Sequence, residues 1–116
     1  MNPNTPELTR IFREEVDERT RRLLEGARLL SAGELAADAV ADLVRDAHTI
    51  KGSAGLLGYE LMRDGATRLE DMWRGVTEGT TVDSGDVVLM EALAGRLGSA
   101  IDDPDERAAF EADYAE

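Results

Sequence analysis

A chain of 116 residues, 42% of them hydrophobic, has room for one domain with a modest core. Its 13 basic side chains are outnumbered by 25 acidic ones, and the resulting net charge of -12 would repel nucleic-acid phosphates and anionic lipid. The absence of cysteine and the presence of only one histidine exclude disulfides, thiolate metal sites and histidine-rich metal sites. We therefore expect a single domain over residues 1–116 that binds neither nucleic acid nor metal.

Membrane insertion and export are also unsupported by the sequence. No apolar run approaches the roughly 20 residues that are needed to cross a bilayer. The N-terminus, Met1-Asn2-Pro3-Asn4, lacks the basic and apolar regions of a signal peptide. We expect a cytoplasmic protein with no membrane contact, and a monomer, because no extended heptad seam is present.

The first two predicted helices are separated by a glycine-containing break. Thr5-Pro6 offers an N-cap and a proline at the first helical position for a helix over residues 6–30. Its apolar stripe consists of Phe12, Val16, Thr20, Leu23, Ala27 and Leu30. After Ser31-Ala32-Gly33, a second helix is predicted over residues 35–57, with Gly58 as its C-cap.

Two more long helices and one short helix follow. The third, over residues 59–78, ends before Gly79 and has the apolar residues Met62, Ala66, Leu69, Trp73 and Val76. The fourth, over 84–101, can be capped by Ser84 and has Met90, Leu93, Leu97 and Ile101. A capping sequence at Asp103-Pro104-Asp105-Glu106 predicts a short fifth helix over 104–114. The fold class is therefore all-α: an antiparallel up-down four-helix bundle with a short fifth C-terminal helix.

The only histidine, His48, lies on a polar face of the second predicted helix. His48, Lys51, Gly52 and Gly55 stand at i, i+3, i+4 and i+7 and share one narrow arc. The apolar residues of the same stretch define another arc, centred roughly 140° away. They are Leu43, Ala47, Ile50, Ala54 and Leu57. The imidazole is therefore expected to point away from the core.

Two glycines inside a helix need an explanation, because each costs up to about 1 kcal/mol relative to alanine. One explanation is clearance, which lets another protein bring a reacting group onto His48. An exposed imidazole, an ammonium one turn on at Lys51 and an open approach are what phosphoryl acceptance from a partner requires. The alternatives are close helix packing for Gly55 and a solvated ion pair of Lys51 with Glu60 or Asp64.

The run His48-Thr49-Ile50-Lys51-Gly52-Ser53-Ala54-Gly55 resembles the phosphoacceptor motif of histidine-containing phosphotransfer (HPt) domains. It is most similar to the N-terminal phosphotransfer domain of CheA-type chemotaxis histidine kinases. The resemblance continues through Leu57-Gly58-Tyr59 to Leu69-Glu70-Asp71, and more loosely back to Phe12-Arg13-Glu14-Glu15. It implies that His48 accepts a phosphoryl group on Nε2 from a histidine kinase catalytic domain and passes it to an aspartate of a response regulator receiver domain.

The resemblance also implies roles for residues around His48. Glu70 matches the glutamate that hydrogen-bonds Nδ1 and leaves the Nε2 lone pair free. Lys51 would neutralise charge on the phosphorylated histidine. Thr67 stands one turn before Glu70, where CheA-type domains often place a second histidine, so we expect only a small contribution from it.

Partner binding is expected on the same face of the second helix. Gly52 and Gly55 would give access to the imidazole, and an exposed Leu56 would contact a receiver domain. The chain needs no cofactor of its own, since ATP is held by the kinase and Mg²⁺ by the kinase and the response regulator.

Two questions stay open at the level of sequence. The chain can be a free-standing phosphotransfer protein or part of a CheA-like kinase, and its start at Met1 and the first-helix resemblance favour the second. It can also be a degenerate helical-bundle interaction domain without phosphotransfer. An autonomous acid–base enzyme using His48 and Glu70 is disfavoured, because an outward-facing histidine on a small bundle offers no concave substrate pocket.

Overall fold

The computed structural model describes residues 5–100, which form four helices. In chain order these are α1 (Thr5–Ala32), α2 (Ala37–Leu57), α3 (Glu60–Thr77) and α4 (Ser84–Ala100). Their ends lie within about two residues of the predicted ones, which is the usual uncertainty of helix boundaries, and residues 5–100 contain no strand. The all-α class and the four helices are confirmed, whereas the predicted fifth helix, 104–114, lies outside the described residues.

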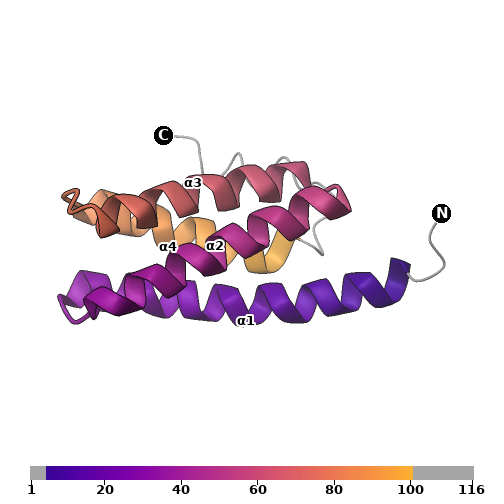
Figure 1. Ribbon diagram of the computed structural model, residues 1–116, viewed down its shortest axis with the longest axis horizontal. Coiled ribbons are helices and arrows are strands. Elements are labelled where there is room, and N and C mark those ends of the chain that lie inside the picture. Colours follow the sequence, from indigo (N-terminus) through magenta and orange to yellow (C-terminus); the bar gives the residue numbers. More distant parts are fainter. Residues whose placement is uncertain (1–4, 101–116) are drawn as a thin grey trace.

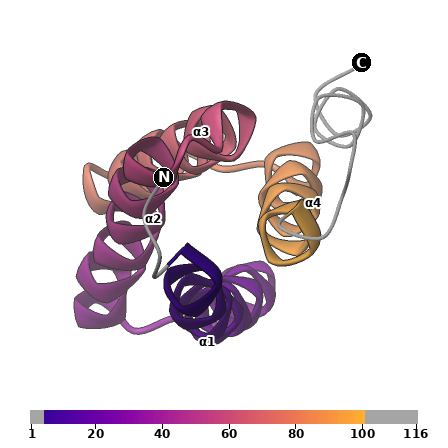
Figure 2. The same cartoon turned by 90° about the vertical axis from the view of Figure 1, so that its right-hand side faces the viewer.

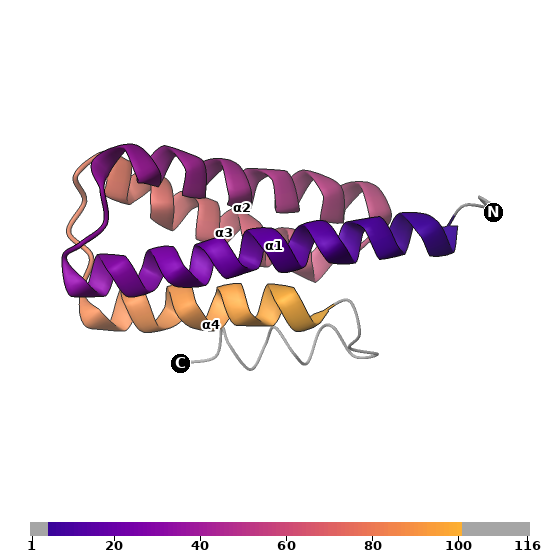
Figure 3. The ribbon, with the colours of Figure 1, turned by 90° about the horizontal axis from the view of Figure 1, so that it is seen from below.

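Successive helices run in opposite directions, as in an up-down bundle (Figures 1 and 3). α1 packs against α2 and α4, and α3 packs against the same two helices, so that α1 and α3 are diagonal to each other (Figure 2). The most extensive contact joins α2 and α3. Side chains on the facing sides of these two helices are therefore brought together.

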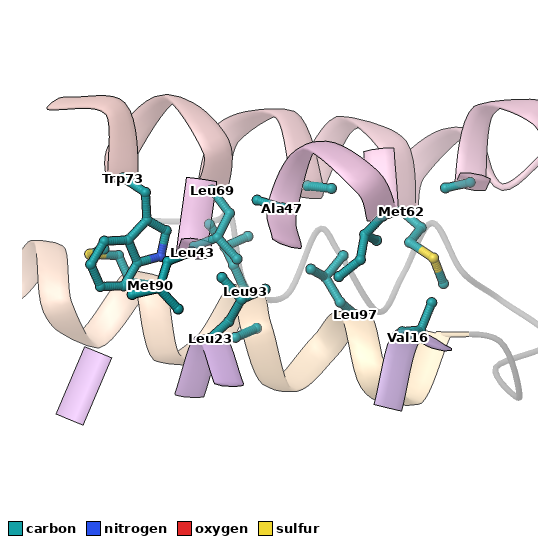
Figure 4. Close-up of a cluster of buried hydrophobic side chains, with 14 of the residues drawn as sticks. Val16, Leu23, Leu43, Ala47, Met62, Leu69, Trp73, Met90, Leu93 and Leu97 are labelled. Carbon is teal, nitrogen blue, oxygen red and sulfur yellow. The ribbon is translucent and has the colours of Figure 1, made fainter. Parts of the chain in front are cut away.

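The predicted apolar stripes meet in one core that all four helices share (Figure 4). Its largest fully buried side chains are Val16, Leu23, Ile50, Met62, Leu69, Trp73, Met90, Leu93 and Leu97. Leu30, Leu57 and Val76, at the ends of three stripes, are only partly buried. Within the described part of the chain, no helix is both long and apolar enough to cross a membrane.

The ends of two helices show why the chain turns where it does. Gly58 closes α2 with a left-handed backbone, φ 87°, and the Tyr59 N–H donates to the Ala54 carbonyl at 2.9 Å, so the predicted C-cap is confirmed. The cap predicted at Ser84 is wrong by one residue. Asp83 accepts from the Asp86 N–H at 2.8 Å, while the Asp83 N–H donates to the Asp86 carboxylate at 3.1 Å. This reciprocal pair begins α4 because the Asp83 side chain can reach the N–H three residues on.

An ion cluster centred on Asp46 joins α2 to α1. The Asp46 side chain is only 5% exposed, and its Oδ1 accepts from Arg19 Nη1 and from Arg22 Nη2, both at 2.8 Å. The same arginines form the intrahelical pairs that their spacing predicts, Arg19 with Glu15 and Arg22 with Glu18. The hydrogen bond to Asp46 raises the pKa of Arg22 above its ordinary value. Asp46 therefore fixes which side of α2 faces α1.

Candidate functional site

His48 lies in the second half of α2 on a side that the core does not cover. Its side chain is 59% exposed, whereas the neighbouring Ala47 and Ile50 are buried. Asp46, two residues earlier, points to α1. Since two residues turn a helix by about 200°, His48 is carried to the opposite side of α2. The structure thus confirms the prediction that His48 points away from the core.

Nδ1 of His48 lies 3.1 Å from Oε2 of Glu70 on α3. Glu70 is almost completely buried, with 4% of its side chain exposed. An ionised carboxylate can only accept hydrogen bonds, so this contact requires the proton of a neutral imidazole to be on Nδ1. Nε2 then carries the free lone pair and is the nucleophilic nitrogen of the ring.

Two cations complete the surroundings of Glu70. Lys51 Nζ, from α2, lies 2.8 Å from Oε1. Arg74, from α3, places Nη2 2.6 Å and Nε 3.0 Å from Oε2. The structure therefore pairs Lys51 with Glu70 rather than with Glu60 or Asp64. Arg74 was not predicted, although its i,i+4 spacing from Glu70 is a known signal for such a pair.

The charge state of Glu70 follows from two opposing effects. Burial raises the pKa of its carboxyl, because a charged group is disfavoured away from water. The hydrogen bonds from Lys51, Arg74 and His48 outweigh burial and lower the pKa to about 2. Glu70 is therefore ionised at neutral pH and available as the acceptor for Nδ1.

The two glycines on the His48 face have different surroundings. A Cβ added at Gly52 meets no atom within 4 Å, so no packing within residues 5–100 requires glycine there. A Cβ at Gly55 would lie 3.2 Å from Cδ of Arg63 on α3. The space at Gly55 is therefore limited by the Arg63 side chain, whereas the space at Gly52 is open.

Thr67 lies one turn before Glu70 on α3 but bonds within its own helix. Its hydroxyl donates to the backbone carbonyl of Arg63 at 2.8 Å, within α3. A small side chain that bonds to its own helix does not take the place of the second histidine of CheA-type domains.

An apolar patch lies beside the His48 face and comprises Leu8, Ile11 and Leu56. Leu56 is 86% exposed, and Leu8 and Ile11 are 40% and 45% exposed. These residues line a shallow groove between α1 and the last turns of α2, together with Phe12, Glu15, Ser53 and Leu57. Leu56 stands eight residues after His48, which places it about 80° around α2 from His48, so the patch lies between the His48 face and α1.

No metal centre accompanies this arrangement in the described residues. Within 5–100, no group of three or more histidine, cysteine, aspartate or glutamate side chains is placed to hold a metal ion. The chemistry that the site itself offers is that of an oriented, exposed imidazole beside an ammonium and a guanidinium.

Comparison with known proteins identifies the class of this bundle. The family model of the Hpt domain matches residues 7–115. The chain therefore belongs to the Hpt domain family, and membership implies a phosphorelay role in His–Asp signalling. A search of curated proteins and a search of solved structures each gave no match.

Replacing Glu70 tests the charge balance of the site. The pKa of about 2 is below the ordinary 4.5, so the stability contributed by ionised Glu70 is present above about pH 4.5 and is lost as the pH falls toward 2. We expect E70Q to lower the free energy of unfolding at pH 7 by on the order of 2 kcal/mol. The gap from wild type should shrink with acidification. Urea denaturation followed by Trp73 fluorescence measures both.

Glu25 provides the matched control, because it is exposed and pairs with Arg28, three residues away on α1. E25Q should change the free energy of unfolding by less than about 0.5 kcal/mol at any pH. A gap between E70Q and wild type that stays constant from neutral to acid pH would contradict the lowered pKa.

Proposed function

We propose that this chain accepts a phosphoryl group on Nε2 of His48 from a histidine kinase catalytic domain and passes it to an aspartate of a response regulator. The observation that carries the proposal is the contact of Nδ1 with the buried Glu70 carboxylate at 3.1 Å, on an imidazole that is 59% exposed. Such a contact leaves the Nε2 lone pair on the accessible side of the ring.

In the first transfer, the Nε2 lone pair attacks the γ-phosphorus of ATP held by the kinase. The Nε2–P bond forms, the bond between the γ-phosphorus and the bridging oxygen breaks, and ADP leaves with that electron pair. The ring becomes an imidazolium that keeps its Nδ1 proton. The negative charge of Glu70 stabilises this cation. In the proposed step, Lys51 turns from the Glu70 carboxylate, with which it is paired in the structure, and neutralises charge on the new phosphoryl group.

In the second transfer, an aspartate oxygen of the receiver domain attacks the same phosphorus. The Nε2–P bond breaks, its electron pair returns to Nε2, and the neutral imidazole with its proton on Nδ1 is regenerated. The receiver's carboxylates would hold Mg²⁺, which would supply charge neutralisation for the phosphoryl oxygens. Residues of this chain return to their starting state, so the domain is an intermediate and not an autonomous kinase.

The motif and its environment support a CheA-like origin in a cytoplasmic chemotaxis pathway. His48, Lys51, Gly52 and Glu70 match the CheA-type phosphotransfer domain. The side chains of His48 and Lys51 both contact Glu70. Thr67 is the departure from that pattern. The proposal therefore rests on the shared acceptor and glutamate rather than on a second histidine.

The apolar patch of Leu8, Ile11 and Leu56 is the surface that we propose for receiver docking. Exposed leucine and isoleucine side chains lose water when a partner covers them, which favours binding by about 25 cal/mol per Å² of apolar surface. Gly52 lies between the patch and His48 along α2, and a Cβ added there would meet no atom within 4 Å.

Loss of His48 tests the proposed function directly. A histidine kinase catalytic core with ATP should add one acid-labile phosphoryl group to the wild-type chain and none to H48Q, as measured by intact mass spectrometry. Glutamine keeps a polar side chain of similar length on the exposed face, so the fold is retained. Absence of the gain across several kinase cores and with phosphoramidate as a small donor would favour the alternative, a helical interaction domain without phosphotransfer.

Replacement of Leu56 tests the docking surface. L56E should slow transfer from phosphorylated His48 to a receiver domain on the order of tenfold, because a charge replaces an apolar contact. Stopped-flow or quench-flow transfer assays measure the rate. V88E is the matched control, because Val88 is 63% exposed and lies on α4, diagonal to α2. The V88E variant should transfer the phosphoryl group at the wild-type rate. Equal rates for L56E and V88E would exclude the patch.

A further inference from the structure

We propose that Arg74 is a positioning residue for phosphoryl transfer, which anchors the Glu70 carboxylate so that Oε2 stays directed at Nδ1 of His48. This inference rests on the proposed function and assigns to it a residue that the phosphoacceptor motif does not contain. It concerns the orientation of the acceptor ring and not the identity of the acceptor.

The contacts of Glu70 divide between its two oxygens. Oε1 faces Lys51 Nζ at 2.8 Å. Oε2 faces His48 Nδ1 at 3.1 Å and also accepts hydrogen bonds from Nε and Nη2 of Arg74, at 3.0 and 2.6 Å. A carboxylate turns about its last carbon–carbon bond unless both oxygens are held. Arg74 holds the oxygen that orients the imidazole.

Arginine suits this task better than a second lysine would. Its planar guanidinium directs two N–H groups at one oxygen in a fixed geometry, whereas an ammonium is a point charge on a flexible stem. Arg74 is 55% exposed, but its partner Glu70 is only 4% exposed. The pair is therefore unlike an exposed i,i+4 pair, whose partners are both solvated and contribute little.

The two cations also differ in the helix that bears them. Lys51 lies on α2 with His48, and it has to turn toward the phosphoryl group if it is to neutralise it. Arg74 lies on α3 with Glu70, four residues away. When Lys51 turns away, Arg74 remains to keep the carboxylate ionised and in place under the ring.

The neighbouring turn of α3 gives an independent reason for Arg74. One turn before Glu70, the Thr67 hydroxyl donates to the Arg63 carbonyl at 2.8 Å and is therefore engaged within its own helix. The additional partner of Glu70 comes instead from one turn after it, at Arg74.

The test uses the imidazole of His48 as the probe, because it is the only histidine of the chain. In ¹⁵N-labelled wild type near pH 8, the ring nitrogens should show a protonated Nδ1 and an unprotonated Nε2. R74M removes the guanidinium and keeps the aliphatic stem. We expect its nitrogen signals to move toward a mixture of the two tautomers, and its phosphorylation by phosphoramidate to slow on the order of tenfold.

Two further variants make the result specific. R28M makes the same replacement at an exposed arginine that pairs with Glu25 on α1, and should give wild-type ring signals and rates. R74K keeps a cation near Glu70 but lacks the two N–H groups that the planar guanidinium directs at Oε2. It should lie between wild type and R74M in both measurements. A purely structural role for Arg74 would lower the free energy of unfolding without moving the ring signals.

Wild-type ring signals together with a wild-type rate in R74M would overturn the proposal. Failure of the proposed function is distinguishable from this, because wild type itself would then take no phosphoryl group from any donor. In that case the ¹⁵N signals of R74M still decide whether Arg74 orients the ring.

Discussion

The buried charge of Glu70 is the constraint on which the site depends. A carboxylate that is 4% exposed is costly to ionise unless hydrogen-bonded cations and donors surround it. Those partners come from α2, as His48 and Lys51, and from α3, as Arg74. Pairing this one carboxylate therefore links the orientation of the imidazole, its tautomer and the contact between the two helices.

A second buried carboxylate acts on the other side of α2. Asp46 is held by Arg19 and Arg22 of α1, while His48, two residues on, is held by Glu70 of α3. A rotation of α2 that moved the imidazole would break both clusters and leave two buried carboxylates without their partners, which is unfavourable. The imidazole of His48 is thus exposed on a helix whose rotation is fixed from two sides, which is a form of preorganisation.

Much of this arrangement follows from the sequence, and the remainder has identifiable physical causes. Apolar periodicity predicts the four helices and the outward phase of His48, because burial of one stripe per helix decides the fold. Glu70 is found only through the family resemblance. Asp46 and Arg74 are missed, since a charged residue in an acidic chain is by default solvated. Their pairing depends on how helices turn toward one another, which periodicity along one helix does not specify.

The finer errors have the same origin. Ser84 and Asp83 are both good N-caps by residue type, and the path of the chain into α4 selects Asp83. Gly52 and Gly55 look equivalent in sequence, yet only Gly55 packs against a neighbouring helix, through Arg63. In each case the residue type limits the possibilities, and a contact with another part of the chain selects among them.

The measurement that tests the account most directly is the position of the phosphoryl group on the ring of phosphorylated His48. Heteronuclear ³¹P and ¹⁵N NMR of the labelled chain resolves the two nitrogens, and no other histidine interferes. If Glu70 occupies Nδ1 as the structure shows, phosphorus will be bonded to Nε2, and Nδ1 will retain its proton. Phosphorus on Nδ1 would contradict the account, because the Glu70 contact would then have to be broken for transfer to occur.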